Sequence, residues 1–184
     1  MRGMNVMRRG TRLDGNGQAV HLLDSICKSH RLQIRSSYGA EMLAAAHGLD
    51  DAYPTIVTLH ELTEGVLSPE ALKNLRELGG LCISVVLTID AESVYKSLTS
   101  RDLKVPTEKT LLGHVSWLRE CLDLGIIRKL QWCDTRDMTA DGHTKGSIDR
   151  ELLLKVMSGS QSYSHDLKTF IPFKAKSNDQ KVDF

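Results

Sequence analysis

The chain has 184 residues, of which 41% are hydrophobic, 26% charged and 5% aromatic. This composition suits one folded domain and excludes an intrinsically disordered protein. The four cysteines contain no CxxC pair that could hold zinc, and no stretch is apolar enough for a signal sequence or a membrane span. We therefore expect an intracellular protein, cytoplasmic or nuclear, with no membrane partner.

The net charge of +1 conceals an uneven distribution along the chain. Residues 1–36 carry a net charge of +5, and residues 37–100 carry a net charge of −6. A basic edge beside an acidic middle is typical of a nucleic-acid binder that also holds a cation among carboxylates. Scattered surface charge is the alternative explanation of the same pattern.

The first half of the chain predicts a hairpin followed by helices. Alternating residues at about 3–9 and 18–25 predict two strands, joined by a turn at residues 14–17. Ser36 or Ser37 is expected to cap a helix that either stops near Tyr53 or kinks at Pro54 and continues toward Thr63. A further helix is predicted to open at Ser68 and Pro69 and to close at Gly79 and Gly80.

The second half alternates strands and helices. The apolar, β-branched run at 81–89 predicts a central strand covered on both faces. Helices are predicted at 91–99, 107–124 and 139–157, and a strand at 126–133. These elements describe an α/β fold, a sheet with flanking helices. We expect one domain over residues 1–157, followed by a flexible polar tail over 158–184.

Three acidic residues occupy positions where an α/β sheet usually places a site. Glu41 lies about one turn inside the first long helix, Asp90 follows the apolar strand directly, and Asp141 lies at the start of the last helix. Side chains after such a strand project into the crevice that these sheets use for ligands. Each acid alone is more typical of a solvated or capping group.

The three acids belong to three segments with a recognisable order. Residues 35–43 read RSSYGAEML, residues 88–98 read TIDAESVYKSL, and residues 140–145 read ADGHTK. They resemble the SSTEAEY-like helix start, the strand followed by Asp-Asn, and the AD-x-LTK ending of the ribonuclease H domain in copia-type retrotransposon polyproteins. The resemblance covers roughly residues 20–155 and implies a ribonuclease H-like mixed sheet with flanking helices.

The resemblance also implies a chemistry. Ribonucleases H are endonucleases that hydrolyse the RNA strand of an RNA/DNA hybrid with Mg²⁺ or Mn²⁺, and two-metal hydrolysis uses carboxylates that hold ions about 3.5–4 Å apart. By resemblance, Glu41, Asp90 and Asp141 are the catalytic residues and metal ligands. An upstream reverse transcriptase segment is the implied partner. Our candidates for contacting the phosphates of the hybrid are Lys28, Arg31 and Arg35.

The sequence departs from this family in several places. The family has a fourth acid, an Asp on a strand before the hairpin, and we expect this domain to be truncated there. Asp14 lies in the turn, and Asp24 would lie about 10 Å from the missing Asp, two strand spacings away. Metal binding and hydrolysis are therefore expected to be weak or absent, and the hairpin is expected to leave an unpaired edge. His143 replaces an apolar residue and is predicted to be a packing or surface group.

Two other functions are compatible with the sequence, in addition to that of a weak nuclease. One is a catalytically inactive module of the same fold that binds nucleic acid or another protein. The other is an unrelated α/β protein whose acids all lie on different faces of the surface. The sequence carries no signal for the oligomeric state.

Overall fold

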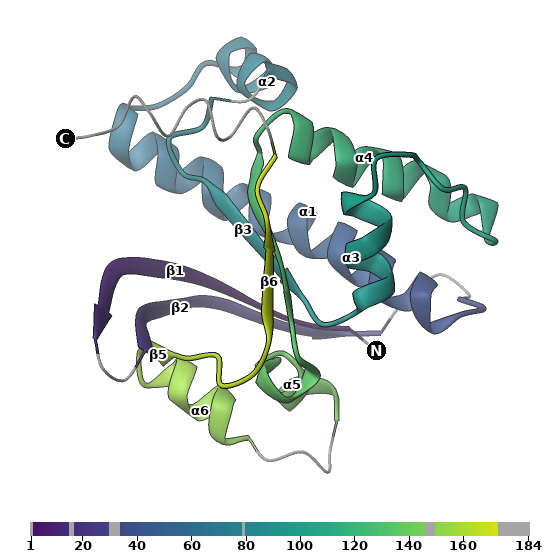
Figure 1. Cartoon of the computed structure of the whole chain (residues 1–184). Helices are drawn as coiled ribbons and strands as arrows, with labels where there is room; N and C mark the ends of the chain where they lie inside the picture. Colours follow the sequence, from purple (N-terminus) through teal and green to yellow (C-terminus); the bar gives the residue numbers. More distant parts are fainter. Residues whose placement is uncertain (1, 15–16, 30–33, 79, 146–149, 173–184) are drawn as a thin grey trace.

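The computed structural model describes residues 2–14, 17–29, 34–78, 80–145 and 150–172, and these residues form an α/β fold (Figure 1). The elements follow the order of strands and helices expected from the sequence through β4. In chain order they are β1 (Arg2–Asp14), β2 (Gly17–Lys28), α1 (Ser37–Glu64), α2 (Pro69–Leu78), β3 (Val85–Ile89), α3 (Glu92–Thr99), η1 (Lys109–Leu111), α4 (Leu112–Asp123), β4 (Ile127–Cys133), η2 (Thr135–Asp137), α5 (Asp141–Thr144), α6 (Glu151–Met157), β5 (Ser160–Gln161) and β6 (Leu167–Phe170).

The strands form two sheets of three strands within the described residues. The first has the order β1-β2-β5 and is antiparallel. The second has the order β3-β4-β6, with β3 parallel and β6 antiparallel to β4. The predicted hairpin is confirmed as β1 and β2. Among the described residues β1 pairs with β2 alone and β3 with β4 alone, so the expected unpaired edge of the hairpin is present.

Three helices pack on the second sheet and enclose the main core. α1, α3 and α4 contact one another and the strands β3 and β4 (Figure 1). The core draws on apolar faces of all three helices and on the strands. Its fully buried members include Met42, Val94, Val115, Leu118, Ile127 and Leu130. On the other sheet, α6 packs against β2 and β5, and α5 contacts β1 and β2.

α1 begins at the predicted cap and continues through its proline. The Ser36 hydroxyl accepts a hydrogen bond from the backbone N–H of Gly39 at 3.0 Å, which satisfies a free N–H of the first turn. Pro54 lies inside the helix at an exposed position, where its missing N–H leaves a gap in the hydrogen-bond ladder. The helix ends at Gly65, whose φ of 101° is favourable for glycine. Of the two expectations, a helix that stops near Tyr53 and a helix that continues past Pro54 toward Thr63, the second is confirmed.

The prediction of a central strand over 81–89 is wrong. The strand begins at Val85 and lies at the edge of its sheet, and Ile89 is its one buried residue. β4 occupies the centre instead. At the start of the run, the backbone N–H of Cys82 donates to His60 Nδ1 at 3.1 Å and not to a strand partner.

The prediction of one helix over 139–157 is also wrong. Two short helices, α5 and α6, take its place, and Lys145 between them has extended backbone angles (φ −113°, ψ 109°). The break lets α6 pack back on α5. Gly142 is buried there, and a Cβ on it would lie 3.3 Å from the side chain of Leu153. A side chain at this position would require Leu153 to shift by a few tenths of an ångström.

The flexible tail predicted from residue 158 is wrong over residues 158–172. β5 pairs with β2 at Gln18 and Ala19, and β6 pairs with β4 from Leu130 to Cys133. The domain therefore extends past residue 157, and both sheets gain their third strand from this segment. The rest of the predicted tail, residues 173–184, lies outside the described residues.

None of the helices in the described part of the chain combines the length and apolar character needed to cross a membrane.

Candidate functional site

Three elements bring the predicted acids to one region. Glu41 projects from the second turn of α1, Asp90 follows the last residue of β3, and Asp141 is the first residue of α5. α1 packs on β3, which places the start of the helix beside the end of the strand. Glu41 keeps part of its surface exposed to solvent, and Asp90 and Asp141 are more deeply buried. The group therefore lies at the surface.

The three carboxyl groups lie within range of one another's charge. Partial burial raises the pKa of Glu41 above its usual value, and the charges of Asp90 and Asp141 raise it further. Burial likewise raises the pKa of Asp90, followed by the charge of Asp141. Like charges that disfavour one another's ionisation lie close together. We call Glu41, Asp90 and Asp141 the acid cluster.

β4 and η2 fix the position of Asp90. The indole Nε1–H of Trp132 donates to the backbone carbonyl oxygen of Asp90 at 2.7 Å, which holds the main chain where it leaves β3. The hydroxyl of Thr135 hydrogen-bonds the Asp90 side chain and favours its charged form. Both partners follow from the parallel pairing of β3 with β4, because the carboxyl ends of parallel strands meet at one edge.

Lys145 supplies a cation to the acid cluster. Its Nζ lies 2.6 Å from Asp141 Oδ2, and the Asp141 side chain is only 13% exposed. The hydrogen bond to Asp141 raises the pKa of Lys145, and the charges of Asp141, Asp90 and Glu41 add to that effect. The ammonium therefore lies within the field of all three acids and offsets part of their repulsion.

The acid cluster offers donors suited to a divalent ion without forming a closed cage. Carboxylate oxygens are ligands that Mg²⁺ prefers, and this ion commonly keeps several waters and uses only one or two carboxylates. Within the described residues, no three side chains of His, Cys, Asp or Glu are grouped tightly enough to enclose a metal ion. The donor chemistry thus fits a hydrated ion held by one or two of the acids.

β1 holds the turn that carries Asp141. The Asn5 side chain contacts two groups around α5: its Oδ1 lies 2.7 Å from His143 Nε2, and its Nδ2 donates to Thr139 Oγ1 at 3.2 Å. A Cβ on Gly3 would lie 2.6 Å from the backbone oxygen of Ala140, so β1 and α5 are in very close contact. Of the two roles expected for His143, packing or surface, the contact with Asn5 on β1 agrees with packing.

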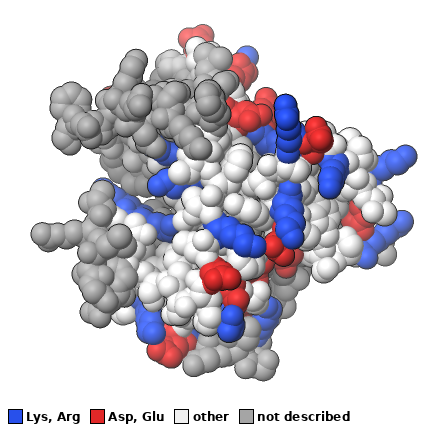
Figure 2. Space-filling view, viewed as in Figure 1, with Lys and Arg blue, Asp and Glu red and all other residues white. Residues whose placement is uncertain are grey.

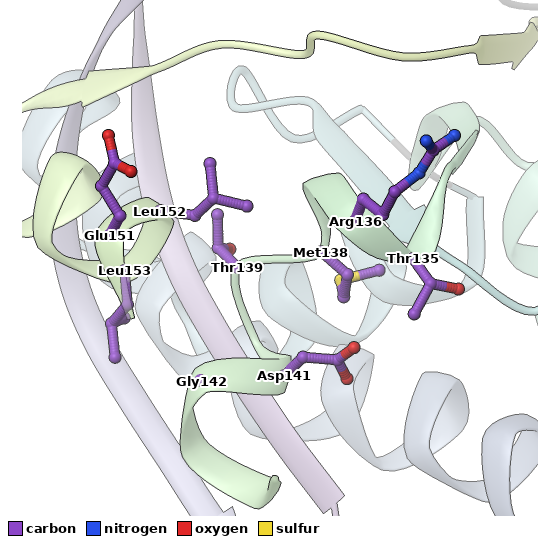
Figure 3. A pocket seen from close by; sticks show the side chains of 9 residues that line it. All are labelled: Thr135, Arg136, Met138, Thr139, Asp141, Gly142, Glu151, Leu152 and Leu153. Carbon is purple, nitrogen blue, oxygen red and sulfur yellow. The ribbon is translucent and has the colours of Figure 1, made fainter. Parts of the chain in front are cut away.

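A cavity of about 370 Å³ adjoins Asp141, between η2, α5 and α6 (Figure 3). Figure 3 shows the carboxyl group of Asp141 on the side of the cavity nearer to Met138 and Thr135, with Glu151 and Leu153 of α6 on the other side. The lining combines apolar and hydroxyl groups with charged groups. Its residues are Thr135, Arg136, Met138, Thr139, Asp141, Gly142, Glu151, Leu152 and Leu153.

The candidate phosphate contacts are only partly described. Lys28 is exposed at the end of β2, and Arg35 is exposed just before α1. The backbone N–H of Arg35 donates to Glu108 Oε1 at 3.0 Å. Arg31 lies outside the described residues. On the face drawn in Figure 2, basic and acidic side chains are interspersed, and no continuous basic surface dominates it.

Sequence reasoning missed several residues that shape the acid cluster. Trp132, Thr135 and Asn5 act across elements far apart in the chain, and no local pattern marked them. Lys145 had a usable signal, because it stands four positions after Asp141, the spacing of a helical ion pair. Asp24, excluded as a ligand from its strand, is exposed on β2 and accepts a hydrogen bond from the backbone N–H of Ser25.

Comparisons with known proteins identify no relative: no family model matches the chain, and no curated protein or solved structure is significantly similar to it.

Proposed function

We propose that this chain is a ribonuclease H-like domain related to copia-type retrotransposon polyproteins, with weak or no hydrolysis of RNA in RNA/DNA hybrids. The electrostatic coupling of Glu41, Asp90 and Asp141 carries the proposal. These acids are distant in sequence and come from three different elements, yet they lie at one edge of the fold. An unrelated protein with scattered surface acids would give no such convergence.

The acid cluster is proposed to bind Mg²⁺ or Mn²⁺ weakly. Hydrolysis of a phosphodiester needs the metal to activate water and to stabilise the leaving oxygen. A fourth carboxylate, which the resemblance implies on a strand beside β1, has no counterpart among the described residues. Because no three of the described His, Cys, Asp or Glu side chains enclose an ion, the acid cluster is expected to hold one loosely and to support little turnover.

A catalytically inactive nucleic-acid-binding module is the second candidate. The ion pair between Lys145 and Asp141 favours it, because an ammonium 2.6 Å from one ligand oxygen competes with a divalent ion for that oxygen. On this reading the fold persists as a binding surface. Lys28 and Arg35 would contact the backbone phosphates, and Arg31 is the third candidate from the sequence.

Cleavage of a labelled RNA/DNA hybrid tests the first candidate. The purified chain should release product slowly or not at all in Mg²⁺, and any product should disappear in Asp90→Asn. Asp123→Asn, an exposed acid at the end of α4, is the matched control and should leave the rate unchanged. Rapid cleavage that depends on Asp90 would show a competent nuclease. Product that forms equally in Asp90→Asn would show that the acid cluster is not its source.

Binding of an uncleavable hybrid tests the second candidate. The affinity should fall as salt concentration rises, because phosphate contacts release counterions. The double variant Lys28→Ala and Arg35→Ala should weaken binding and reduce the salt dependence. Lys73→Ala on α2, where the lysine pairs at the surface with Glu77, is the control. Absence of hybrid binding together with absence of cleavage would contradict both candidates.

A further inference from the structure

A second pair of reactive groups lies at the end of β3 opposite the acid cluster. His60 belongs to the last turns of α1, and Cys82 belongs to the segment that enters β3. His60 Nδ1 lies 3.1 Å from Cys82 Sγ. Cys82 precedes β3 and Asp90 follows it, so the strand separates this pair from the acid cluster.

The surroundings fix the state of the imidazole. His60 is only 6% exposed, and its Nδ1 accepts the backbone N–H of Cys82 at 3.1 Å. A nitrogen that accepts a hydrogen bond carries no proton, so Nδ1 is the unprotonated nitrogen of the ring. Cys82 Sγ lies 3.1 Å from the same nitrogen, so the single lone pair of Nδ1 is shared between the backbone N–H and the thiol of Cys82. The imidazole is therefore placed as a base for that thiol.

The other cysteines lack this arrangement and serve as internal references. Cys121 and Cys133 are buried, and burial raises the pKa of the Cys133 thiol to about 12. Cys27 is exposed like Cys82, but its thiol donates to the backbone carbonyl oxygen of His143 at 3.3 Å. A carbonyl oxygen cannot take up the proton. Cys82 alone among the four combines exposure with a neighbouring base.

The geometry points to Cys82 as a nucleophilic thiol, activated by His60, that is modified by peroxides and other soft electrophiles. The Cys82 proton passes to His60 Nδ1, whose hydrogen bond from the backbone N–H of Cys82 then breaks, and the thiolate sulfur attacks one oxygen of hydrogen peroxide. The O–O bond breaks, the sulfur is oxidised by two electrons, and the departing hydroxide takes the proton from the imidazolium to form water. The product is the sulfenic acid of Cys82. This inference is independent of the proposed function.

Competitive labelling of the native chain tests the inference. The chain is treated with limiting iodoacetamide, and separately with hydrogen peroxide in the presence of dimedone, and each cysteine peptide is quantified by mass spectrometry. Cys82 should react at least about tenfold faster than Cys27 with both reagents. In His60→Gln the Cys82 rate should fall to within about twofold of the Cys27 rate. His114→Gln on α4 should leave the ratio unchanged.

The buried thiols report whether the variant is folded. If Cys121 and Cys133 stay protected in His60→Gln, the loss of Cys82 reactivity belongs to the imidazole rather than to unfolding. If Cys121 and Cys133 become reactive in His60→Gln, that variant is replaced by two other measurements. The first is labelling of the His60→Asn variant. The second is labelling of the wild type unfolded in urea, where the ratio of the Cys82 rate to the Cys27 rate should approach one. The inference would be overturned if Cys82 of the native chain reacted no faster than Cys27. It would also be overturned if Cys82 kept its full rate in a folded variant that lacks the His60 imidazole.

Discussion

At the scale of single residues, Asp90 links the acid cluster to stability. Partial burial, and next the charge of Asp141, raise the pKa of Asp90 above its ordinary value of 3.8. The folded chain therefore binds this proton more tightly than the unfolded chain does. Stability contributed by the neutral form is complete below the ordinary value and is lost as the pH rises through the raised native value.

Replacing Asp90 by Asn should therefore stabilise the fold at neutral pH. The amide keeps the shape and an acceptor for Thr135 but removes the unfavourable charge. Thermal unfolding should show a melting temperature higher by about 2–4 °C at pH 7, the shift expected for about 1 kcal/mol in a domain of this size. The gain should shrink toward pH 3. Asp123→Asn should show no such pH-dependent gain, and a less stable Asp90→Asn at pH 7 would contradict the assignment.

The charge of Lys145 shifts the pKa values in the acid cluster in the direction opposite to burial. Its charge lowers the pKa values of Glu41 and Asp90, against the larger effect of burial. Lys145→Met should therefore raise both pKa values further, as measured by NMR titration of the side-chain carboxyl carbons. Lys155→Met, which removes an exposed lysine paired with Glu151, is the control. Unchanged titration of Glu41 and Asp90 in Lys145→Met would place the ammonium away from the cluster.

At the scale of elements, the contact between β1 and α5 sets the place of Asp141. Gly3→Ala would put a Cβ 2.6 Å from the backbone oxygen of Ala140, so the turn before α5 must shift. We expect a loss of about 1–3 kcal/mol in the free energy of unfolding, measured in urea. Gly10→Ala lies on the same strand with its nearest atoms at 3.4 Å and should change stability by less than about 0.5 kcal/mol. Equal effects of the two variants would show that the close approach is absent.

The same scale shows where sequence reasoning succeeds and where it fails. The hairpin, the cap at Ser36, the helix from Pro69 and the strand to Cys133 follow from local turn, capping and apolar patterns. The third strand of each sheet was missed because β5 and β6 pair with strands more than thirty residues away, and polar sequences carry no local strand signal. The edge position of β3 likewise depends on tertiary pairing.

The acid cluster was predictable to a similar extent. Glu41, Asp90 and Asp141 could be selected because each stands at a helix start or a strand end, and such positions meet at one edge of an α/β sheet. The pairing of Lys145 with Asp141 follows a helical four-residue spacing, whereas its effect on Glu41 and Asp90 depends on the tertiary arrangement. The packing of α6 beside Gly142 likewise has no local signal in the sequence.

At the scale of the whole molecule, Arg9 joins the two sheets. It extends from β1 to the second sheet, where its guanidinium donates to Gln131 Oε1 at 2.9 Å and lies 3.4 Å from Thr88 Oγ1. It also donates to the Tyr163 hydroxyl at 2.7 Å. Since the described strands show no β1 to β3 pairing, these side-chain bonds are part of what holds the sheets together.

Removal of this guanidinium should weaken the whole fold. Arg9→Met leaves Gln131, which is only 9% exposed, without its charged partner, and we expect a loss of about 1.5–3 kcal/mol in urea unfolding. Arg8→Met, at the exposed neighbouring position of β1, should change stability by less than about 0.5 kcal/mol. If Arg9→Met cost no more than Arg8→Met, the two sheets would not depend on this bridge.

The proposed binding of a divalent ion by the acid cluster is tested most directly by calorimetric titration of the native chain with Mg²⁺ and Mn²⁺. We predict weak, saturable binding that falls by on the order of tenfold or more in Asp90→Asn and in Asp141→Asn, while Asp123→Asn binds like the wild type. No binding by the native chain, or binding that is equal in Asp90→Asn, would contradict the account.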